Sequence, residues 1–219
     1  MIKALLFDMD GLLLDSERVV QYSWNVAGKQ LGYGKVGEHI YKTLGMNVTG
    51  RIAYFKQALG EEFPYDEFQA LSRKAFFEVA DNEGIPLKQG AKELISYAKQ
   101  MGYRIGLVTS SRREYAVDIL TKAGIFHYFD GCMFGDMVTK SKPDPEIYRK
   151  SAEILGVRPE YCIAFEDAPA GVESATAAGI DVIMIPDLVK PDEETKMRAW
   201  KVLDTLDEAI ALLRMEARG

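Results

Sequence analysis

The chain has 219 residues, of which 47% are hydrophobic and 27% charged, and its formal net charge is -6 at pH 7. This length and composition are typical of a globular protein with one domain, or with one domain and a smaller second one. The negative charge argues against nucleic acid or an anionic membrane as the main partner, so an anionic ligand would need a local positive site. We find no pattern typical of a signal peptide or a membrane span, and therefore expect a cytoplasmic protein.

The chain begins with an apolar run, Ile2 to Phe7, that ends in Asp8, Met9, Asp10 and Gly11. A short apolar run of this kind indicates a strand buried on both faces. Because an extended chain alternates sides, the two aspartates would project in the same direction. Two carboxylates about 4 Å apart repel each other by about 4 kcal/mol at an effective dielectric near 20. A divalent cation or a shared proton would relieve this repulsion, although the short motif alone is more typical of a turn with capping acids.

Apolar residues then recur at helical spacing in four segments, at residues 16–31, 36–44, 49–59 and 65–80. Breaks that contain glycine separate these segments. We find no strand pattern between residues 16 and 82. This part of the chain therefore predicts an all-helical insertion.

From residue 83 onward, predicted helices and strands alternate. The strands are expected at residues 103–108, 131–134, 161–165 and 181–185, and the helices at 91–101, 113–123, 145–155, 170–178 and 204–216. This alternation predicts an α/β fold with a doubly wound parallel sheet. We expect residues 1–15 and 83–219 to form the α/β core and residues 16–82 to form an inserted helical cap domain. The two cysteines lie in apolar strand-like stretches and are expected to be buried free thiols.

Polar residues follow several of the predicted strands. They are Asp8, Asp10, Thr109, Ser110, Lys142, Glu166 and Asp167. In a doubly wound sheet, ligands bind outside the carboxyl ends of the strands, where these side chains would meet. Acids without histidine or cysteine favour Mg²⁺ over zinc, and hydroxyls, helix amides and a lysine suit a phosphate group. Each residue alone is also typical of a helix cap or a solvated loop, but their coincidence at one sheet edge favours a site.

Four stretches resemble the motifs of the haloacid dehalogenase superfamily. They are Phe7–Glu17, Val108–Ser111, Ser141–Pro145 and Phe165–Gly171. The helical insertion after the first stretch resembles the cap of the subgroup that contains β-phosphoglucomutase and small-molecule phosphatases. The resemblance implies a Rossmann-like core. Because dehalogenase members lack the second acid and the metal, Asp10 argues against dehalogenation.

The resemblance also implies roles for these residues. By motif position, Asp8 is the nucleophile and Asp10 the general acid and base. Thr109 would donate to the phosphoryl oxygens, and Lys142 would neutralise both Asp8 and the transferring group. The cofactor would be Mg²⁺, and its implied ligands are Asp8, Asp10 through its backbone carbonyl, Glu166 and Asp167.

Further residues are expected near the substrate or its phosphate. They are Met9, Gly11, Ser110, Ser111, Arg113, Asn47 and Arg51. The last two belong to a turn at residues 45–51 that is either a substrate-reading loop of the cap or an ordinary helix connection. Arg113 either meets the substrate or occupies the solvated first turn of a helix. Where β-phosphoglucomutase relatives carry an arginine and a histidine, this sequence has Val48 and Val20.

We therefore expect a Mg²⁺-dependent phosphatase that hydrolyses a small phosphorylated metabolite, such as a sugar phosphate, through an aspartyl phosphate. A β-phosphoglucomutase-type mutase is the first alternative, which the missing arginine disfavours. A non-catalytic phospho-ligand sensor is the second alternative, and Asp10 disfavours it because a binding protein needs no second acid beside the nucleophile. We expect a monomer with neither nucleic acid nor a membrane as partner.

Overall fold

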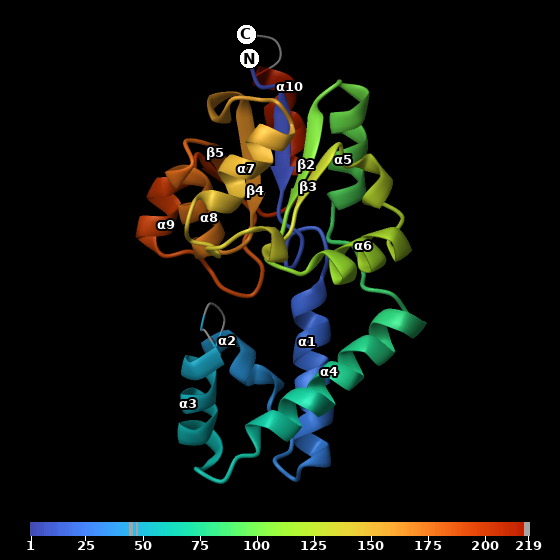
Figure 1. The fold of residues 1–219 in the computed structure, drawn as a ribbon, viewed down its shortest axis with the longest axis vertical. Coiled ribbons are helices and arrows are strands. Elements are labelled where there is room, and N and C mark those ends of the chain that lie inside the picture. The colour runs from blue at the N-terminus through green and yellow to red at the C-terminus, as the bar shows by residue number, and fades with distance from the viewer. Residues whose placement is uncertain (44–45, 47, 217–219) are drawn as a thin grey trace. The chain divides into compact units, whose positions relative to one another are not determined.

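The computed structural model describes residues 1–43, 46 and 48–216. The chain divides into two compact units (Figure 1), an α/β unit of residues 1–15 with residues 86 onward and a helical unit of residues 16–85. The chain leaves and re-enters the α/β unit at neighbouring points, because the Asp15 amide donates to the Pro86 carbonyl at 2.8 Å. Beside this bond, the Lys88 amide donates to the Leu13 carbonyl at 2.9 Å.

Six parallel strands form the sheet of the α/β unit. They are β1 (Ala4–Phe7), β2 (Arg104–Val108), β3 (Gly131–Met133), β4 (Cys162–Glu166), β5 (Asp181–Met184) and β6 (Lys201–Val202). Their order is β3-β2-β1-β4-β5-β6, and every neighbouring pair is parallel. The direction of winding reverses at β1, which lies between β2 and β4, and ligands bind at such a reversal. The prediction of a doubly wound parallel sheet is confirmed.

The main helices of this unit are α5 (Ala91–Gln100), α6 (Arg113–Lys122), α7 (Glu146–Ile154), α8 (Pro169–Ala177), α9 (Glu193–Arg198) and α10 (Glu208–Glu216). Short 3-10 turns lie at η2 (Phe126–Tyr128), η3 (Gly135–Met137) and η4 (Pro159–Tyr161). Two of these elements, α9 and β6, were not predicted from the sequence. Both residues of β6 are exposed, so this strand leaves no apolar pattern in the sequence.

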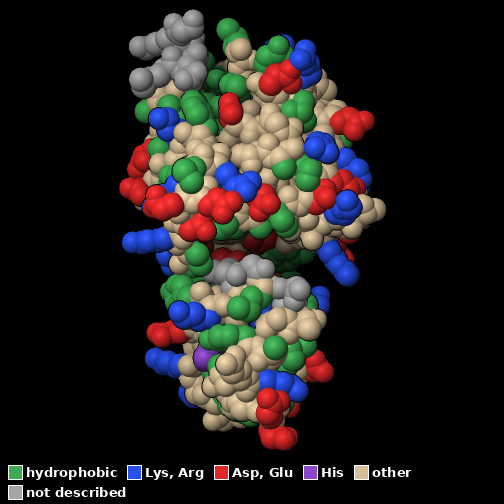
Figure 2. Space-filling view, turned by 90° about the vertical axis from the view of Figure 1, so that its left-hand side faces the viewer, with side chains coloured by type: hydrophobic (Ala, Val, Ile, Leu, Met, Phe, Trp, Pro, Cys, Tyr) green, Lys and Arg blue, Asp and Glu red, His purple; other side chains and the backbone are tan. Residues whose placement is uncertain are grey.

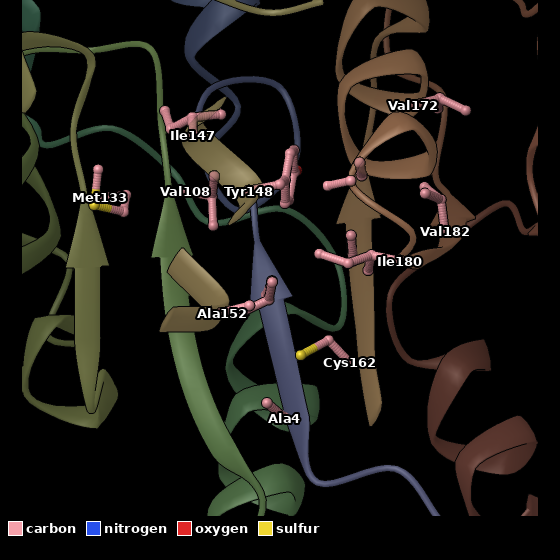
Figure 3. Packing of buried hydrophobic residues seen from close by; sticks show 14 of the residues in the cluster. Ala4, Val108, Met133, Ile147, Tyr148, Ala152, Cys162, Val172, Ile180 and Val182 are labelled. Atoms are coloured by element: carbon pink, nitrogen blue, oxygen red, sulfur yellow. The ribbon is translucent and has the colours of Figure 1, made fainter. Parts of the chain in front are cut away.

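A hydrophobic cluster lies between the sheet and helices α7 and α8 (Figure 3). Tyr148 of α7 and Val172 of α8 belong to it together with strand residues such as Ala4. The alternate strand residues are buried on the opposite face, where the rings of Phe7 and Phe165 stack with their centroids 4.8 Å apart. Because both faces of the central strands are covered, polar side chains are found only at the ends of these strands.

The helical unit contains α1 (Ser16–Gln30), the 3-10 turn η1 (Gly37–His39), α2 (Ile40–Thr43), α3 (Val48–Leu59) and α4 (Tyr65–Asn82). Its core is aromatic. Phe55 is fully buried, and its ring centroid lies 5.3 Å from that of Trp24 and 5.1 Å from that of Phe68. Aromatic pairs at these distances stabilise a small core beyond the area that they bury.

The segment expected as one helix at residues 36–44 instead begins as η1 and continues as α2. Gly37 explains this difference because it packs directly against α1. A Cβ atom on Gly37 would lie 2.4 Å from the Gln21 carbonyl oxygen, and the Gly37 amide donates to Asn25 Oδ1 at 2.8 Å. The backbone at this point is therefore held by α1 before the regular helix begins.

On the face drawn in Figure 2, acidic and basic side chains are interspersed over both units. Both cysteines are free thiols, with Cys162 buried and Cys132 half-buried. Of the described helices, none is long and apolar enough to span a bilayer.

Candidate active site

Three carboxylates lie together at the carboxyl ends of two adjacent strands. Asp8 follows β1, Glu166 is the last residue of β4, and Asp167 follows it. One carboxylate oxygen of each residue lies within 4.8 Å of those of the other two. Asp8 and Glu166 are buried, with 7% and 1% of their surfaces exposed, and Asp167 is half-buried. A group of oxygen donors this close together suits a hard divalent cation.

The ammonium group of Lys142 lies between two of these acids. Its Nζ donates to Asp8 Oδ1 and to Glu166 Oε1, both at 2.6 Å, and to the Val108 carbonyl at 3.1 Å. An ammonium group has three protons to donate, so each has a partner here. The side chain is 9% exposed, which makes this a buried ion-pair network.

The loop before α7, which carries this lysine, is fixed by hydrogen bonds on both sides. The Glu146 carboxylate accepts from the Thr139 hydroxyl at 2.7 Å and from the Lys140 amide at 2.9 Å. On the other side, the Ser174 hydroxyl of α8 donates to the Asp144 carbonyl at 2.6 Å. The position of the ammonium group therefore depends on contacts with two helices.

Burial and charge act against one another in this network. Burial by itself would lower the pKa of Lys142, but the charges of Asp8 and Glu166 raise it above its ordinary value. Burial raises the pKa of Glu166, and the charge of Lys142 opposes that shift. Burial, followed by the charge of Glu166, also raises the pKa of Tyr148, whose hydroxyl donates to Glu166 Oε1 at 2.5 Å. With all three acids ionised, one lysine leaves an excess of negative charge that a divalent cation would balance.

Asp10 is held by the loop after β2. The Ser111 hydroxyl donates to Asp10 Oδ2 at 2.7 Å, and the Ser111 amide donates to Thr109 Oγ1 at 3.0 Å. Thr109 is 1% exposed, and its amide donates to the Met133 carbonyl at 3.0 Å. A threonine hydroxyl that accepts one hydrogen bond still has its own proton to donate, so Thr109 retains a donor for a ligand.

Gly11 brings the backbone turn after β1 directly against Asp167. Its φ is +80°, and a Cβ atom there would lie 2.3 Å from Asp167 Oδ2. Glycine is the residue that adopts this conformation without strain and permits such an approach. The Gly11 amide donates to the Leu14 carbonyl at 3.0 Å within the turn. The Met9 side chain is fully buried, so only its backbone remains for contact with a ligand.

Other predicted site residues take no part in the contacts described above. Ser110 and Arg113 are exposed, and the Arg113 amide donates to Asp136 Oδ1 at 3.3 Å at the start of α6. Arg51 belongs to α3 of the helical unit. Asn47 lies outside the described residues. The roles assigned to these residues stay predictions.

Tyr148 and the ion pair of Lys88 with Asp187 were not predicted from the sequence. Lys88 Nζ lies 2.6 Å from Asp187 Oδ1, and the Asp187 side chain is 2% exposed. A Cβ atom on Gly11 would lie 3.6 Å from Asp187 Oδ2, so this acid is close to the same turn. Its signal in the sequence was the one that identified Asp167, namely a polar residue shortly after a buried parallel strand.

Comparison with known proteins identifies the family. The model of the haloacid dehalogenase-like hydrolases matches residues 2–179. The phosphorylated carbohydrates phosphatase of Thermotoga maritima is 30% identical over 83% of this chain and 84% of its own length. The validoxylamine A 7'-phosphate phosphatase of Streptomyces hygroscopicus subsp. limoneus is 34% identical over 82% of this chain and 84% of its own.

Among solved structures, a CbbY variant from Rhodobacter sphaeroides in complex with xylulose-(1,5)bisphosphate aligns with a TM-score of 0.76. It is 28% identical, and the alignment covers 95% of this chain and 96% of CbbY. The resemblance inferred from the four motifs is therefore confirmed. The chain belongs to the haloacid dehalogenase-like hydrolase family and is an enzyme of its phosphatase type.

Proposed function

We propose that this enzyme hydrolyses a small phosphorylated metabolite of the sugar phosphate class through an aspartyl phosphate formed on Asp8. The main support is the contact of Asp8 with Lys142 inside a cluster of carboxylates. A carboxylate that attacks a phosphate dianion meets like-charge repulsion, which a neighbouring cation reduces. The names of the two phosphatase relatives support the substrate class.

We propose Mg²⁺ as the cofactor because the available donors fit it. Asp8, Glu166 and Asp167 offer only oxygen ligands, and hard cations such as Mg²⁺ prefer these. The backbone carbonyl of Asp10 is a further proposed ligand. When bound, Mg²⁺ would offset the negative charges of the substrate phosphate and of the attacking carboxylate.

The side chains then divide the reaction into two steps. Asp8 forms a bond to phosphorus while the bond from phosphorus to the leaving oxygen breaks, and Asp10 gives that oxygen a proton. Asp10 next takes a proton from water, whose oxygen attacks phosphorus, releases phosphate and restores the Asp8 carboxylate. Ser111 orients Asp10 by donating a hydrogen bond to one of its carboxylate oxygens. Thr109 and Lys142 would donate to the phosphoryl group.

We propose that the helical unit acts as the cap that selects the substrate. Such units control which molecules reach a reacting centre and exclude water from it. Hydrolysis is favoured over phosphosugar mutase activity because Val48 and Val20 stand where the resembling mutases carry an arginine and a histidine. A mutase must hold a second phosphate, and valine offers neither a charge nor a hydrogen bond for this purpose.

The test uses p-nitrophenyl phosphate and then a panel of phosphorylated metabolites. We expect phosphate release that requires Mg²⁺ and stops with a chelator. Asp8→Asn should abolish turnover while the circular dichroism spectrum and the unfolding midpoint remain close to those of the wild type. Substantial activity of Asp8→Asn would refute the covalent route, and isomerisation of glucose 1-phosphate that depends on a bisphosphate would establish the mutase instead. No phosphate release from any member of the panel would support the sensor.

A further inference from the structure

A second buried ion pair, between Lys88 and Asp187, lies close to the carboxylate cluster, and the proposed catalytic steps do not use it. Lys88 Nζ donates to Asp187 Oδ1 at 2.6 Å, although the two residues are 99 positions apart in the sequence. The Asp187 side chain is 2% exposed and that of Lys88 is 18% exposed, so solvent screens these charges weakly. Asp187 follows β5, and Lys88 belongs to the segment by which the chain re-enters the α/β unit.

Both members of the pair border the turn that follows β1. The Lys88 amide donates to the Leu13 carbonyl at 2.9 Å, which fixes the lysine backbone to this turn. A Cβ atom on Gly11 would lie 3.6 Å from Asp187 Oδ2 and 2.3 Å from Asp167 Oδ2. The carboxylates of Asp187 and Asp167 therefore both lie next to Gly11.

Asp187 can act on the cation site through its charge. Among the described residues, the group of carboxylates close enough together to hold one ion consists of Asp8, Glu166 and Asp167, without Asp187. Charges that are largely removed from water still interact beyond contact distance, because the effective dielectric between them is low. An Asp187 carboxylate without a cationic partner would add negative charge beside Asp167 and attract a cation more strongly. The ammonium group of Lys88 cancels this addition.

We propose that Lys88 is a positioning residue that limits the affinity of the site for its divalent cation by neutralising Asp187. The two charges act on a bound cation in opposite directions, so a change to either one alone unbalances the site. The inference deepens the proposed function and rests on it, since it assumes that the three carboxylates bind the cation.

The test measures the affinity of the full-length, metal-free protein for Mn²⁺, which prefers the same oxygen ligands as Mg²⁺. The EPR signal of free Mn²⁺ is followed at constant pH and ionic strength, and Mg²⁺ is measured by competition. Lys88→Met leaves the Asp187 charge in place and should tighten binding about tenfold. Asp187→Asn leaves the Lys88 charge in place and should weaken binding about tenfold. A role confined to holding the fold together would instead weaken binding in both variants.

Further variants separate charge from packing. The double variant Lys88→Met with Asp187→Asn has neither charge, and Lys88→Arg keeps both, so each should bind within about twofold of the wild type. The matched controls are Lys99→Met and Asp130→Asn. They break an ion pair of 2.8 Å near the amino end of β3, at the opposite edge of the sheet, and should leave the affinity unchanged. If circular dichroism shows that Lys88→Met does not fold, Asp187→Asn and the double variant decide the question.

Shifts of the same sign in the two single variants would overturn the proposal. A double variant that binds as weakly as Asp187→Asn would also overturn it, because Asp187 would then be a direct ligand of the cation. A wild type that shows no saturable binding would refute the cofactor and the inference together. Opposite shifts in a protein that releases no phosphate from any member of the panel would refute the proposed function and support the role of Lys88.

Discussion

Replacing Lys142 by methionine would remove the cation between Asp8 and Glu166. At 2.6 Å from an oxygen of each acid, each attraction amounts to about 6 kcal/mol at an effective dielectric near 20, before the cost of desolvation is subtracted. Desolvation cancels much of this energy, but removal of one partner leaves the remaining charges buried and unpaired. We therefore expect Lys142→Met to lower the free energy of unfolding of the metal-free protein by about 3–5 kcal/mol at neutral pH.

Urea unfolding in a chelating buffer, followed by circular dichroism, measures this loss. Lys140→Met is the matched control in the same loop. Its side chain is 71% exposed and lies 3.4 Å from Asp144, so the change should stay below about 1 kcal/mol. Mg²⁺ should stabilise Lys142→Met more than the wild type, because the variant has the larger excess of negative charge.

The loss in Lys142→Met should also depend on pH. Burial raises the pKa of Glu166 to about 7, and loss of the lysine raises it further. An acid with a raised pKa in the folded state takes up a proton as the pH falls, which removes its buried charge. The destabilisation should therefore be largest above neutral pH and shrink as the pH falls toward the pKa of unfolded glutamate. A loss below about 1 kcal/mol at every pH would refute the view that these acids depend on the lysine.

Three further predictions concern groups around the site and the core. The hydrogen bond from Lys150 is the largest cause that lowers the pKa of Glu146, to about 2, so the stability from this carboxylate should be complete above about pH 4.5 and lost toward pH 2. The unfolding free energies of wild type and Glu146→Gln should accordingly differ at neutral pH and converge near pH 2, and a constant difference would contradict this. Ser111→Ala should lower kcat about tenfold, because Asp10 loses a charge-assisted hydrogen bond; a change below about twofold would show that another group orients this acid. Burial raises the pKa of both cysteine thiols to about 11, so at about pH 8 they should react with a disulfide reagent at below about 1% of the rate of a free thiol.

The fold was predictable because the apolar runs that specify its strands are local patterns in the sequence. Strands buried on both faces require unbroken apolar runs, and the alternation of such runs with helical segments specifies a parallel sheet. The positions of Asp8 and Asp167 at the sheet edge follow from the same rule. The strand β6 escaped prediction because two exposed residues have no apolar pattern, and Gly37 altered a predicted helix through a contact with α1 that only the folded chain reveals.

The parts of the site that depend on contacts distant in sequence were not predictable from patterns. Lys142 was grouped with the strand-end residues from the sequence, but its role beside Asp8 was expected only through the family resemblance, since a lysine in a loop has no periodicity. In the sequence, Tyr148 matches the pattern of an ordinary core residue of an amphipathic helix. Only the folded structure shows that its hydroxyl donates to Glu166.

The hydrogen bond between the Asp15 amide and the Pro86 carbonyl joins the two points at which the helical unit is attached. An insertion with adjacent ends places little constraint on the domain that receives it. The contacts of Lys142 with Asp8 and Glu166, by contrast, belong entirely to the α/β unit. Evolution can therefore exchange or remodel the inserted helices while the buried charges of the α/β unit remain in balance.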